Sequence, residues 1–461
     1  MLGPVKGVAA RSGKSSASYA TGRLHRLAVG FKRLGARLRW RDLRVRWLWK
    51  RWRLAGDSRV LSKLNDAFAN HPDLFSPDDQ YRLARSALIS SPEWNENDHA
   101  LLDILSRNAD AGSTSIIRHT AQVIDKGNSR AGVLRRCVAY DDLGQETSWL
   151  IEKHHFVHKG HLSDNDEATK PFVEAQVYEA VSGWGSLRNF RAPEFMGKQV
   201  TPYGWRLWLE DLEKSGCKKV GTPTDLETAH KIARAVGVFS GNYWLNGDLA
   251  DLPDLSRKGR LPGMLRPKRS QEFIAEATTD LTRGQVDGRG FAEMVLELGS
   301  WSEWLYRRSS DEGAVAVCHG DVHGGNFMVA PDGQLVLLDF EKVCLGPVGL
   351  DMGRFLGEPA MRAARTSTRG KRDIEQFLEE WRAGVKLEYQ HGLEESGVVH
   401  DREIASFNVD YFFVLRVAVL ICERERGGDR RKLHRNSDGI GFLVSYVWDL
   451  GDKLINEMGR R

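Results

Sequence analysis

The residues with the clearest chemical potential lie in one short stretch, 317–341. Asp321 and Asn326 flank a glycine-rich turn, and Asp339 ends an apolar segment that follows the turn at 331–333. Glycines let the backbone fold tightly around a ligand, and a hairpin through 331–333 would return Asp339 to the side of Asn326. A carboxylate and an amide oxygen are hard donors that suit Mg²⁺ held together with phosphates. Asp321 would then remain free to accept a proton from an incoming hydroxyl.

Each of these residues also has a purely structural explanation. An Asp at a strand end followed by glycines often only closes a turn. A His before Gly-Asp is often a hydrogen-bonded loop residue, and we interpret His319 in this way: it orients the loop and transfers no proton. The role of His323 stays open. The joint presence of Asp321, Asn326 and Asp339 at these spacings favours the functional interpretation.

The order of these motifs resembles the catalytic core of the aminoglycoside phosphotransferase and choline kinase superfamily. The matching features are His319-Gly320-Asp321, Asn326 five residues after the Asp, and Asp339-Phe340. Members of this superfamily are small-molecule kinases with a protein-kinase-like fold, and the resemblance extends from about residue 113 to about residue 425. It implies that Asp321 is the catalytic base and that Asn326 and Asp339 hold Mg²⁺.

The resemblance also implies a binding site for the ATP phosphates. Lys153 lies on the third strand, where a cation offsets phosphate charge. Its expected partner is Glu174 on the following helix, with Glu179 as the competing candidate. The turn 127–129, including Ser129, would cover the phosphates with backbone N–H groups, although it carries no G-x-G-x-x-G pattern.

Two further elements follow from the same resemblance. Segment 207–212 resembles the linker between lobes, where backbone groups around Glu210 and Leu212 would bind adenine. Segment 346–351 resembles the element whose Asp supports the catalytic loop, so Asp351 is expected to be structural.

Two departures from protein kinases argue against a peptide substrate. Gly320 replaces the Arg that would bind a phosphorylated activation loop, and Glu341 replaces the Gly that would follow Asp-Phe. Only a few residues separate Asp339 from Gly346-Pro347, which leaves no room for a long activation segment.

The elements expected to position these residues form two lobes. The fold class is therefore α+β, a two-lobed protein-kinase-like fold with a small five-stranded sheet lobe, a larger helical lobe and an N-terminal helical extension. Beyond residue 212 the pattern is helical except for one strand pair around 315–340. The expected strands are 116–124, 133–140, 148–154, 195–200 and 205–209, with helices at 99–107, at 171–181 and from the capping box 224–227 to about 239. The expected domains are a basic amphipathic arm at 1–55, a helical accessory segment at 56–112, an N-lobe at 113–212 and a C-lobe at 213–461.

The composition is that of a globular protein: 461 residues, 41% hydrophobic and 28% charged. Five scattered cysteines without a C-x-x-C pair indicate a reducing compartment. The longest apolar run, 411–422, contains Arg416 and is shorter than the roughly 18 residues of a membrane span. We expect a cytoplasmic protein, at most peripheral at the inner face of a membrane.

The positive charge is concentrated in the first 53 residues. They hold fifteen Lys and Arg against one acid, Asp42, so residues 54–461 carry a net charge of −9. Nucleic acid is therefore not the expected partner of the body. Segment 24–53 combines an apolar stripe with cations and interleaved tryptophans, which suits an anionic membrane surface. A helix that docks on the acidic body and a transit peptide are the other two interpretations.

We predict an ATP- and Mg²⁺-dependent phosphotransferase that moves the γ-phosphoryl group to a hydroxyl of a small molecule or glycan. The acceptor would be a sugar, amino sugar or amino alcohol, and the basic arm mildly favours a membrane-linked one. Asp410, Glu423 and Glu425 would suit a cationic or polyhydroxyl acceptor, although each also fits a solvated helix face. The alternative is a catalytically weak kinase-like scaffold that binds a membrane or an acidic partner through its arm.

Overall fold

The computed structural model describes residues 99–107, 118–125, 133–141, 143–156, 170–182, 190–201, 204–223, 225–245, 271–311, 314–366, 371–397, 401–426 and 437–460. They all fall within one compact unit of the chain, residues 93–157 and 161–461. The basic arm, most of the accessory segment and Ser129 lie outside the described residues, so the predictions made for them stay predictions.

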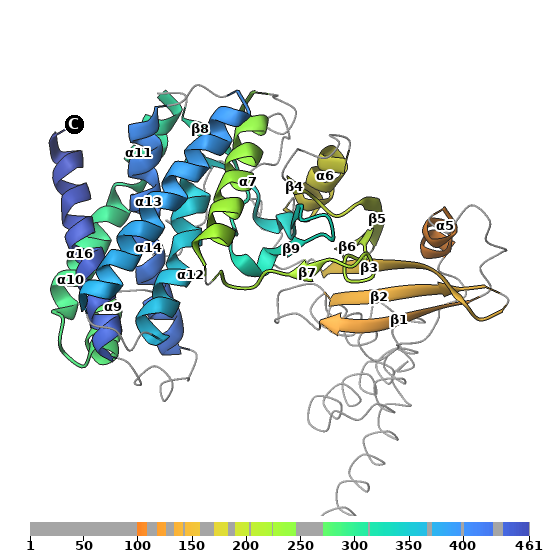
Figure 1. Cartoon of the computed structure of the whole chain (residues 1–461), viewed down its shortest axis with the longest axis horizontal. Coiled ribbons are helices and arrows are strands. Elements are labelled where there is room, and N and C mark those ends of the chain that lie inside the picture. Colours follow the sequence, from red (N-terminus) through yellow and green to blue (C-terminus); the bar gives the residue numbers. More distant parts are fainter. Residues whose placement is uncertain are drawn as a thin grey trace, which may run out of the picture. The chain divides into compact units, whose positions relative to one another are not determined.

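The smaller lobe is a five-stranded antiparallel sheet, as predicted (Figure 1). The strand order is β1-β2-β3-β6-β5, and one helix, α6, lies in the chain between β3 and β5. Side chains in β2 alternate between buried and partly exposed along much of the strand, which is the period of a sheet with one covered face. The bounds are β1 Arg118–Asp125, β2 Val133–Tyr140, β3 Glu146–Phe156, α6 Lys170–Ser182, β5 Phe195–Thr201 and β6 Gly204–Glu210.

The helix predicted at 99–107 is present and packs on this sheet. In α5, His99–Arg107, the residues Leu101, Ile104 and Leu105 share one helical face and are buried. They form a small core with sheet residues that include Leu150 and Trp208. This helix therefore covers part of the sheet.

The larger lobe is helical and holds the main hydrophobic core. Its first helix begins one residue later than the predicted capping box implies, because the Asp225 carboxylate accepts a hydrogen bond from the Thr228 amide at 2.7 Å. The helices are α7 Leu226–Leu245, α9 Gln271–Thr282, α10 Gly288–Ser300, α11 Ser302–Asp311, α12 Leu350–Thr366, α13 Lys371–Glu395, α14 Arg402–Arg426 and α16 Ser437–Arg460.

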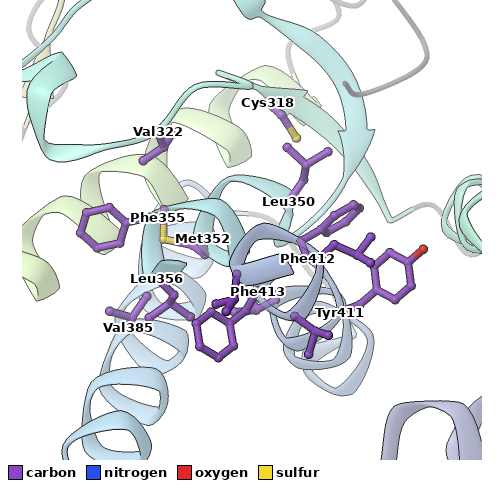
Figure 2. Close-up of a cluster of buried hydrophobic side chains, with 14 of the residues drawn as sticks. Cys318, Val322, Leu350, Met352, Phe355, Leu356, Val385, Tyr411, Phe412 and Phe413 are labelled. Carbon is purple, nitrogen blue, oxygen red and sulfur yellow. The ribbon is translucent and has the colours of Figure 1, made fainter. Parts of the chain in front are cut away.

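Helix α14 forms the centre of this core. By length and composition, its segment Arg402–Cys422 could cross a membrane, but 94% of its most apolar window is buried inside the fold. Figure 2 shows Phe412 of α14 beside Leu350 of α12, and Phe413 of α14 beside Leu356 of α12. A Cβ at Gly353 of α12 would lie 2.5 Å from the Phe412 Cβ, so the glycine permits the close approach of the two helices.

The larger lobe contains more strands than the single pair predicted. Strand β8 pairs with β11, and a separate four-stranded sheet has the order β4-β10-β9-β7. Strands β4 and β7 have two residues each and form through long-range pairing, so no local sequence pattern predicts them. The bounds are β4 Phe190–Arg191, β7 Lys218–Lys219, β8 Val315–Cys318, β9 Phe327–Val329, β10 Leu335–Leu337 and β11 Cys344–Pro347.

All five cysteines are buried thiols.

Candidate active site

The first turn of α12 holds the loop that follows β8 through hydrogen bonds to Asp351. The Asp351 carboxylate is buried and accepts hydrogen bonds from the amides of His319, at 2.7 Å, and Gly320, at 2.8 Å. Burial raises the pKa of Asp351 to about 6, against the opposing effect of these two donors. The predicted supporting role of Asp351 is confirmed by these contacts.

His319 is a buried, hydrogen-bonded loop residue, as predicted. Its Nδ1 accepts from the Asp321 amide at 3.3 Å, so Nε2 carries the proton and donates to the Leu338 carbonyl at 2.8 Å. Burial lowers its pKa to about 4, which keeps the ring neutral. His323 has a different position: its Nδ1 accepts from the Gly325 amide at 3.1 Å and caps the short 3₁₀ helix η3, Gly324–Asn326.

The β9–β10 hairpin brings the second half of the motif back to the first, as predicted. Leu337 pairs with Phe327, and the Leu338 amide donates to the Asn326 carbonyl at 2.9 Å. The Asn326 side-chain amide donates through Nδ2 to the Asp321 carbonyl at 3.0 Å. This hydrogen bond fixes the side chain with its nitrogen toward the loop and leaves Oδ1 as the available ligand atom.

Asp339 follows the hairpin in a left-handed conformation, with φ 63° and ψ 66°. Its amide donates to the Tyr178 hydroxyl of α6 at 3.1 Å, and its carboxylate accepts from Lys153 Nζ at 2.6 Å. Burial opposes ionisation, but the Lys153 ammonium outweighs it and holds the pKa of Asp339 well below its ordinary value. The carboxylate is therefore ionised at neutral pH.

Lys153 joins the sheet lobe to this segment. Its Nζ lies 2.7 Å from Glu174 on α6 as well as 2.6 Å from Asp339. Glu174 is fully buried and lies 3.0 Å from His155 Nε2 through its other oxygen. The competing candidate, Glu179, forms an exposed ion pair with Lys198 instead. Of the two acids, the structure pairs Glu174 with Lys153.

Asp321 is not free, contrary to the sequence-based expectation. Its Oδ2 accepts from Lys342 of the short 3₁₀ helix η4, Phe340–Lys342, and its Oδ1 accepts from Arg354 of α12. Burial opposes ionisation of this carboxyl, but Arg354 and then Lys342 lower its pKa. Sequence reasoning missed both cations, although Arg354 stands three residues after Asp351 and so shares its helix face.

The predicted linker residues lie at the end of β6 and just beyond it. The Glu210 amide donates to the Glu194 carbonyl at 3.0 Å, and the Glu210 carboxylate accepts from Arg191 at 2.5 and 3.0 Å. Leu212 is buried, and its carbonyl accepts from the Cys217 amide at 2.8 Å. The Glu210 side chain thus holds the linker to β4.

Within the part of the chain that the structure describes, no three His, Cys, Asp or Glu side chains group as a metal site. A dedicated all-protein site is not what Mg²⁺ requires, because it keeps waters and takes one or two protein oxygens plus substrate phosphates. Asp339 and the Oδ1 of Asn326 provide such a pair of hard donors, so the residues present fit this ion.

Comparison with known proteins agrees with this arrangement. Residues 222–390, which include the loop 319–326, match the model of the phosphotransferase enzyme family. A segment of 66 residues is 41% identical to methylthioribose kinase 1 of Oryza sativa subsp. japonica, and it covers 14% of this chain and 14% of that relative. The chain thus aligns with only a small part of this curated relative.

Solved structures with a similar fold share little sequence with this chain. An amicoumacin kinase bound to AMP-PNP and Ca²⁺ is 13% identical with a TM-score of 0.45, over 82% of this chain and 94% of that chain. An ethanolamine kinase of Plasmodium vivax is 12% identical with a TM-score of 0.39, over 81% and 94%.

The match over residues 222–390 confirms the resemblance to a phosphotransferase enzyme family for that part of the chain. The kinase-like arrangement also stands on the chain's own contacts, since Lys153 on β3 pairs with Glu174 on the following helix, as the β3 lysine and helix glutamate do in protein kinases.

Proposed function

We propose that this protein is an ATP- and Mg²⁺-dependent phosphotransferase that transfers the γ-phosphoryl group to a hydroxyl of a small molecule or glycan. The observation that supports this most is Lys153, which contacts Glu174 and Asp339 at the same time. This places a fixed cation beside a carboxylate suited to Mg²⁺, which is what ATP phosphates need.

The proposed role of each residue comes from the family resemblance and is supported by the contacts described above. Asp339 and Asn326 would hold Mg²⁺, which when bound neutralises charge on the phosphates. Lys153 would bind the phosphates, with Glu174 fixing its ammonium. Asp321 would orient the acceptor hydroxyl and take its proton; a lowered pKa suits a group that mainly positions the nucleophile, because the transition state of phosphoryl transfer is loose and largely dissociative.

The remaining predicted contacts would be made with the nucleotide. Backbone groups around Glu210 and Leu212 would bind adenine, and the turn that contains Ser129 would cover the phosphates. We further propose that the acceptor is linked to a membrane. The protein itself would be cytoplasmic and bound peripherally to that membrane through residues 24–53.

The test is ATP consumption by the purified chain with Mg²⁺ and a panel of sugars, amino alcohols and aminoglycosides. We expect acceptor-dependent ADP release, and we expect Asp321→Asn to abolish it while Mg·ATP still binds, since Asp321 contacts the acceptor and not the nucleotide. The scaffold alternative predicts no acceptor-dependent turnover with wild type. Full turnover by Asp321→Asn would refute the role of Asp321.

A further inference from the structure

We infer that Arg136 belongs to the nucleotide site and that its guanidinium stacks on the face of the nucleobase. The inference rests on the proposed function and deepens it, because it concerns how the same site would bind ATP. In this arrangement, backbone groups of the linker bind the edge of the base, and Arg136 covers one of its faces.

Arg136 lies on the same face of the five-stranded sheet as Lys153. In the antiparallel register of β2, β3 and β6, Arg136 is opposite Ile151, and Ile151 is opposite Leu209. Residues that are directly opposite in an antiparallel pair share a face of the sheet, and so do residues two apart on one strand. Ile151 stands two residues before Lys153 on β3. Arg136, Ile151 and Leu209 therefore form a row next to Lys153.

This row lies between Lys153 and the linker residues proposed to bind adenine. Leu209 is followed directly by Glu210, which ends β6. The row is about 7 Å from Lys153 along the strand, because a strand rises by about 3.4 Å per residue. A nucleotide with its phosphates at Lys153 and its base at the linker therefore places the base over this row.

The face of the sheet that carries Lys153 is open at this row. Arg136, Ile151 and Lys153 are each partly exposed, and the Arg136 side chain is 23% exposed. The neighbouring residues that point to the opposite face of β2 and β3 are all buried: Arg135, Cys137, Leu150 and Glu152. A flat ligand can thus approach the guanidinium from the Lys153 side of the sheet.

Two acids of the linker region hold the guanidinium by its edge. The Arg136 Nε donates to the Asp211 carboxylate, and Nη2 donates to Asp211 at 3.1 Å and to Glu213 at 2.8 Å. Asp211 is buried, so this end of the pair has a fixed position. The hydrogen bonds of a guanidinium lie in its plane and do not use its two flat faces.

A fixed, planar cation is suited to a nucleobase. Arg guanidinium planes stack on bases in protein complexes with single-stranded nucleic acids, and every base has a π-face that accepts such a contact. The ion pair with Asp211 orients the plane of Arg136 before any nucleotide binds, so little conformational entropy is lost on stacking. The linker acids therefore prepare Arg136 for this contact.

The test compares Arg136→Phe with Arg136→Lys, because these two variants separate stacking from the ion pair. Phe keeps a flat surface and loses the ion pair with Asp211, whereas Lys keeps the positive charge and loses the flat surface. Mg·AMP-PNP is titrated calorimetrically into the full chain, and Mg·triphosphate, which has no base, is measured as its competitor. Thermal unfolding shows that each variant is folded at the temperature of the assay.

We expect Arg136→Lys to weaken Mg·AMP-PNP binding by roughly fivefold or more, and Arg136→Phe to stay within about threefold of wild type. The affinity for Mg·triphosphate should be unchanged in both, since the phosphates are bound at Lys153. Arg289→Lys is the matched control, because Arg289 forms an exposed ion pair with Glu293 within α10. It should bind both compounds as wild type does.

Three results would overturn the inference. Wild-type affinity of Arg136→Lys for Mg·AMP-PNP, or a loss in Arg136→Phe as large as that in Arg136→Lys, would make Arg136 only an ion-pair partner of the linker. A parallel loss of Mg·triphosphate affinity in the folded variants would assign Arg136 to the phosphates. A wild-type chain that binds neither Mg·AMP-PNP nor Mg·triphosphate would instead refute the proposed function.

Discussion

At the scale of single residues, the candidate site depends on Asp339, whose backbone is left-handed although it is not glycine. Its amide donates a hydrogen bond to the Tyr178 hydroxyl, and its carboxylate accepts one from Lys153; these two hydrogen bonds hold the backbone in this conformation. Such a conformation is uncommon for a residue with a side chain and persists where the surroundings fix it. Asn also tolerates the left-handed conformation, so Asp339→Asn removes the negative charge of the carboxylate without straining the backbone.

We therefore expect Asp339→Asn to lower Mg·ATP affinity by at least roughly tenfold, about 1.4 kcal/mol, and to lower the melting temperature modestly, because Lys153 keeps Glu174 but loses its second carboxylate partner. Calorimetric titration of Mg·ATP measures the first and thermal unfolding the second. Asp332→Asn is the matched control, since Asp332 only closes the exposed turn by accepting from the Gln334 amide. Equal Mg·ATP affinity of wild type and Asp339→Asn would make Asp339 a turn residue only.

The buried His319 predicts a pH dependence of stability. An unfolded chain protonates this histidine below its ordinary pKa of 6.5, and the folded chain only below about 4. Between these values protons bind the unfolded chain more, so the stability that His319 contributes is complete above pH 6.5 and is lost as the pH falls to 4, by up to about 3 kcal/mol. Asp351, with its pKa raised to about 6, contributes the opposite trend over part of this range.

Comparing wild type with His319→Gln removes the common contribution of Asp351. The difference in free energy of unfolding between the two proteins should shrink as the pH is lowered from 6.5 to 4, measured by urea denaturation. A difference that stays constant across this range would contradict a buried neutral histidine.

At the scale of elements, the helical lobe depends on close backbone contacts. A Cβ at Gly237 of α7 would lie 2.3 Å from the Tyr389 carbonyl and 3.0 Å from the Gly392 Cα of α13. These are backbone atoms, so a side chain at Gly237 must separate the two helices. The contact between α7 and α13 thus requires glycine on both helices.

Gly237→Ala should destabilise the protein by roughly 1–3 kcal/mol through overpacking, seen as a lower melting temperature. Gly459→Ala, the same substitution in α16 where nothing lies within 4 Å of the added Cβ, should be neutral or slightly stabilising. If both variants melted alike, the close packing of α7 on α13 would not limit stability.

The elements also show what sequence can predict. The strand at 133–140 was predicted with its exact bounds because a strand pattern is a local property of the sequence. Glu174 was preferred over Glu179 because of the family resemblance, and the structure pairs it with Lys153. The cations on Asp321 were missed, since Lys342 and Arg354 reach it only once η4 and α12 pack around the loop. The roles of Asp321, Asn326 and Asp339 in catalysis remain predictions, and the variants Asp321→Asn and Asp339→Asn test two of them.

At the scale of the whole molecule, charge is divided between the first 53 residues and the rest of the chain. A helix with cations and an apolar stripe gains from burial and from attraction to anionic lipid, about 1 kcal/mol per Lys or Arg near the surface. The net charge of −9 on residues 54–461 should contribute no such attraction.

Deleting residues 1–53 should therefore release the protein from anionic liposomes and leave its activity on a soluble acceptor unchanged. Sedimentation with anionic and neutral vesicles, at low and high salt, measures the release. Equal sedimentation of the full-length and truncated chains would exclude a membrane anchor and favour the docking helix or the transit peptide.

The position between His319 and Asp321 restricts how this loop can evolve. Gly320 has φ 74°, and a Cβ there would lie 2.1 Å from the Lys342 carbonyl. Every glycine codon becomes an arginine codon by a change of its first base, so mutation repeatedly offers arginine at this position. Each such variant must displace η4, and with it the lysine that contacts Asp321. The arginine that protein kinases use to read a phosphorylated loop is thus one base away in the gene and sterically barred in the protein.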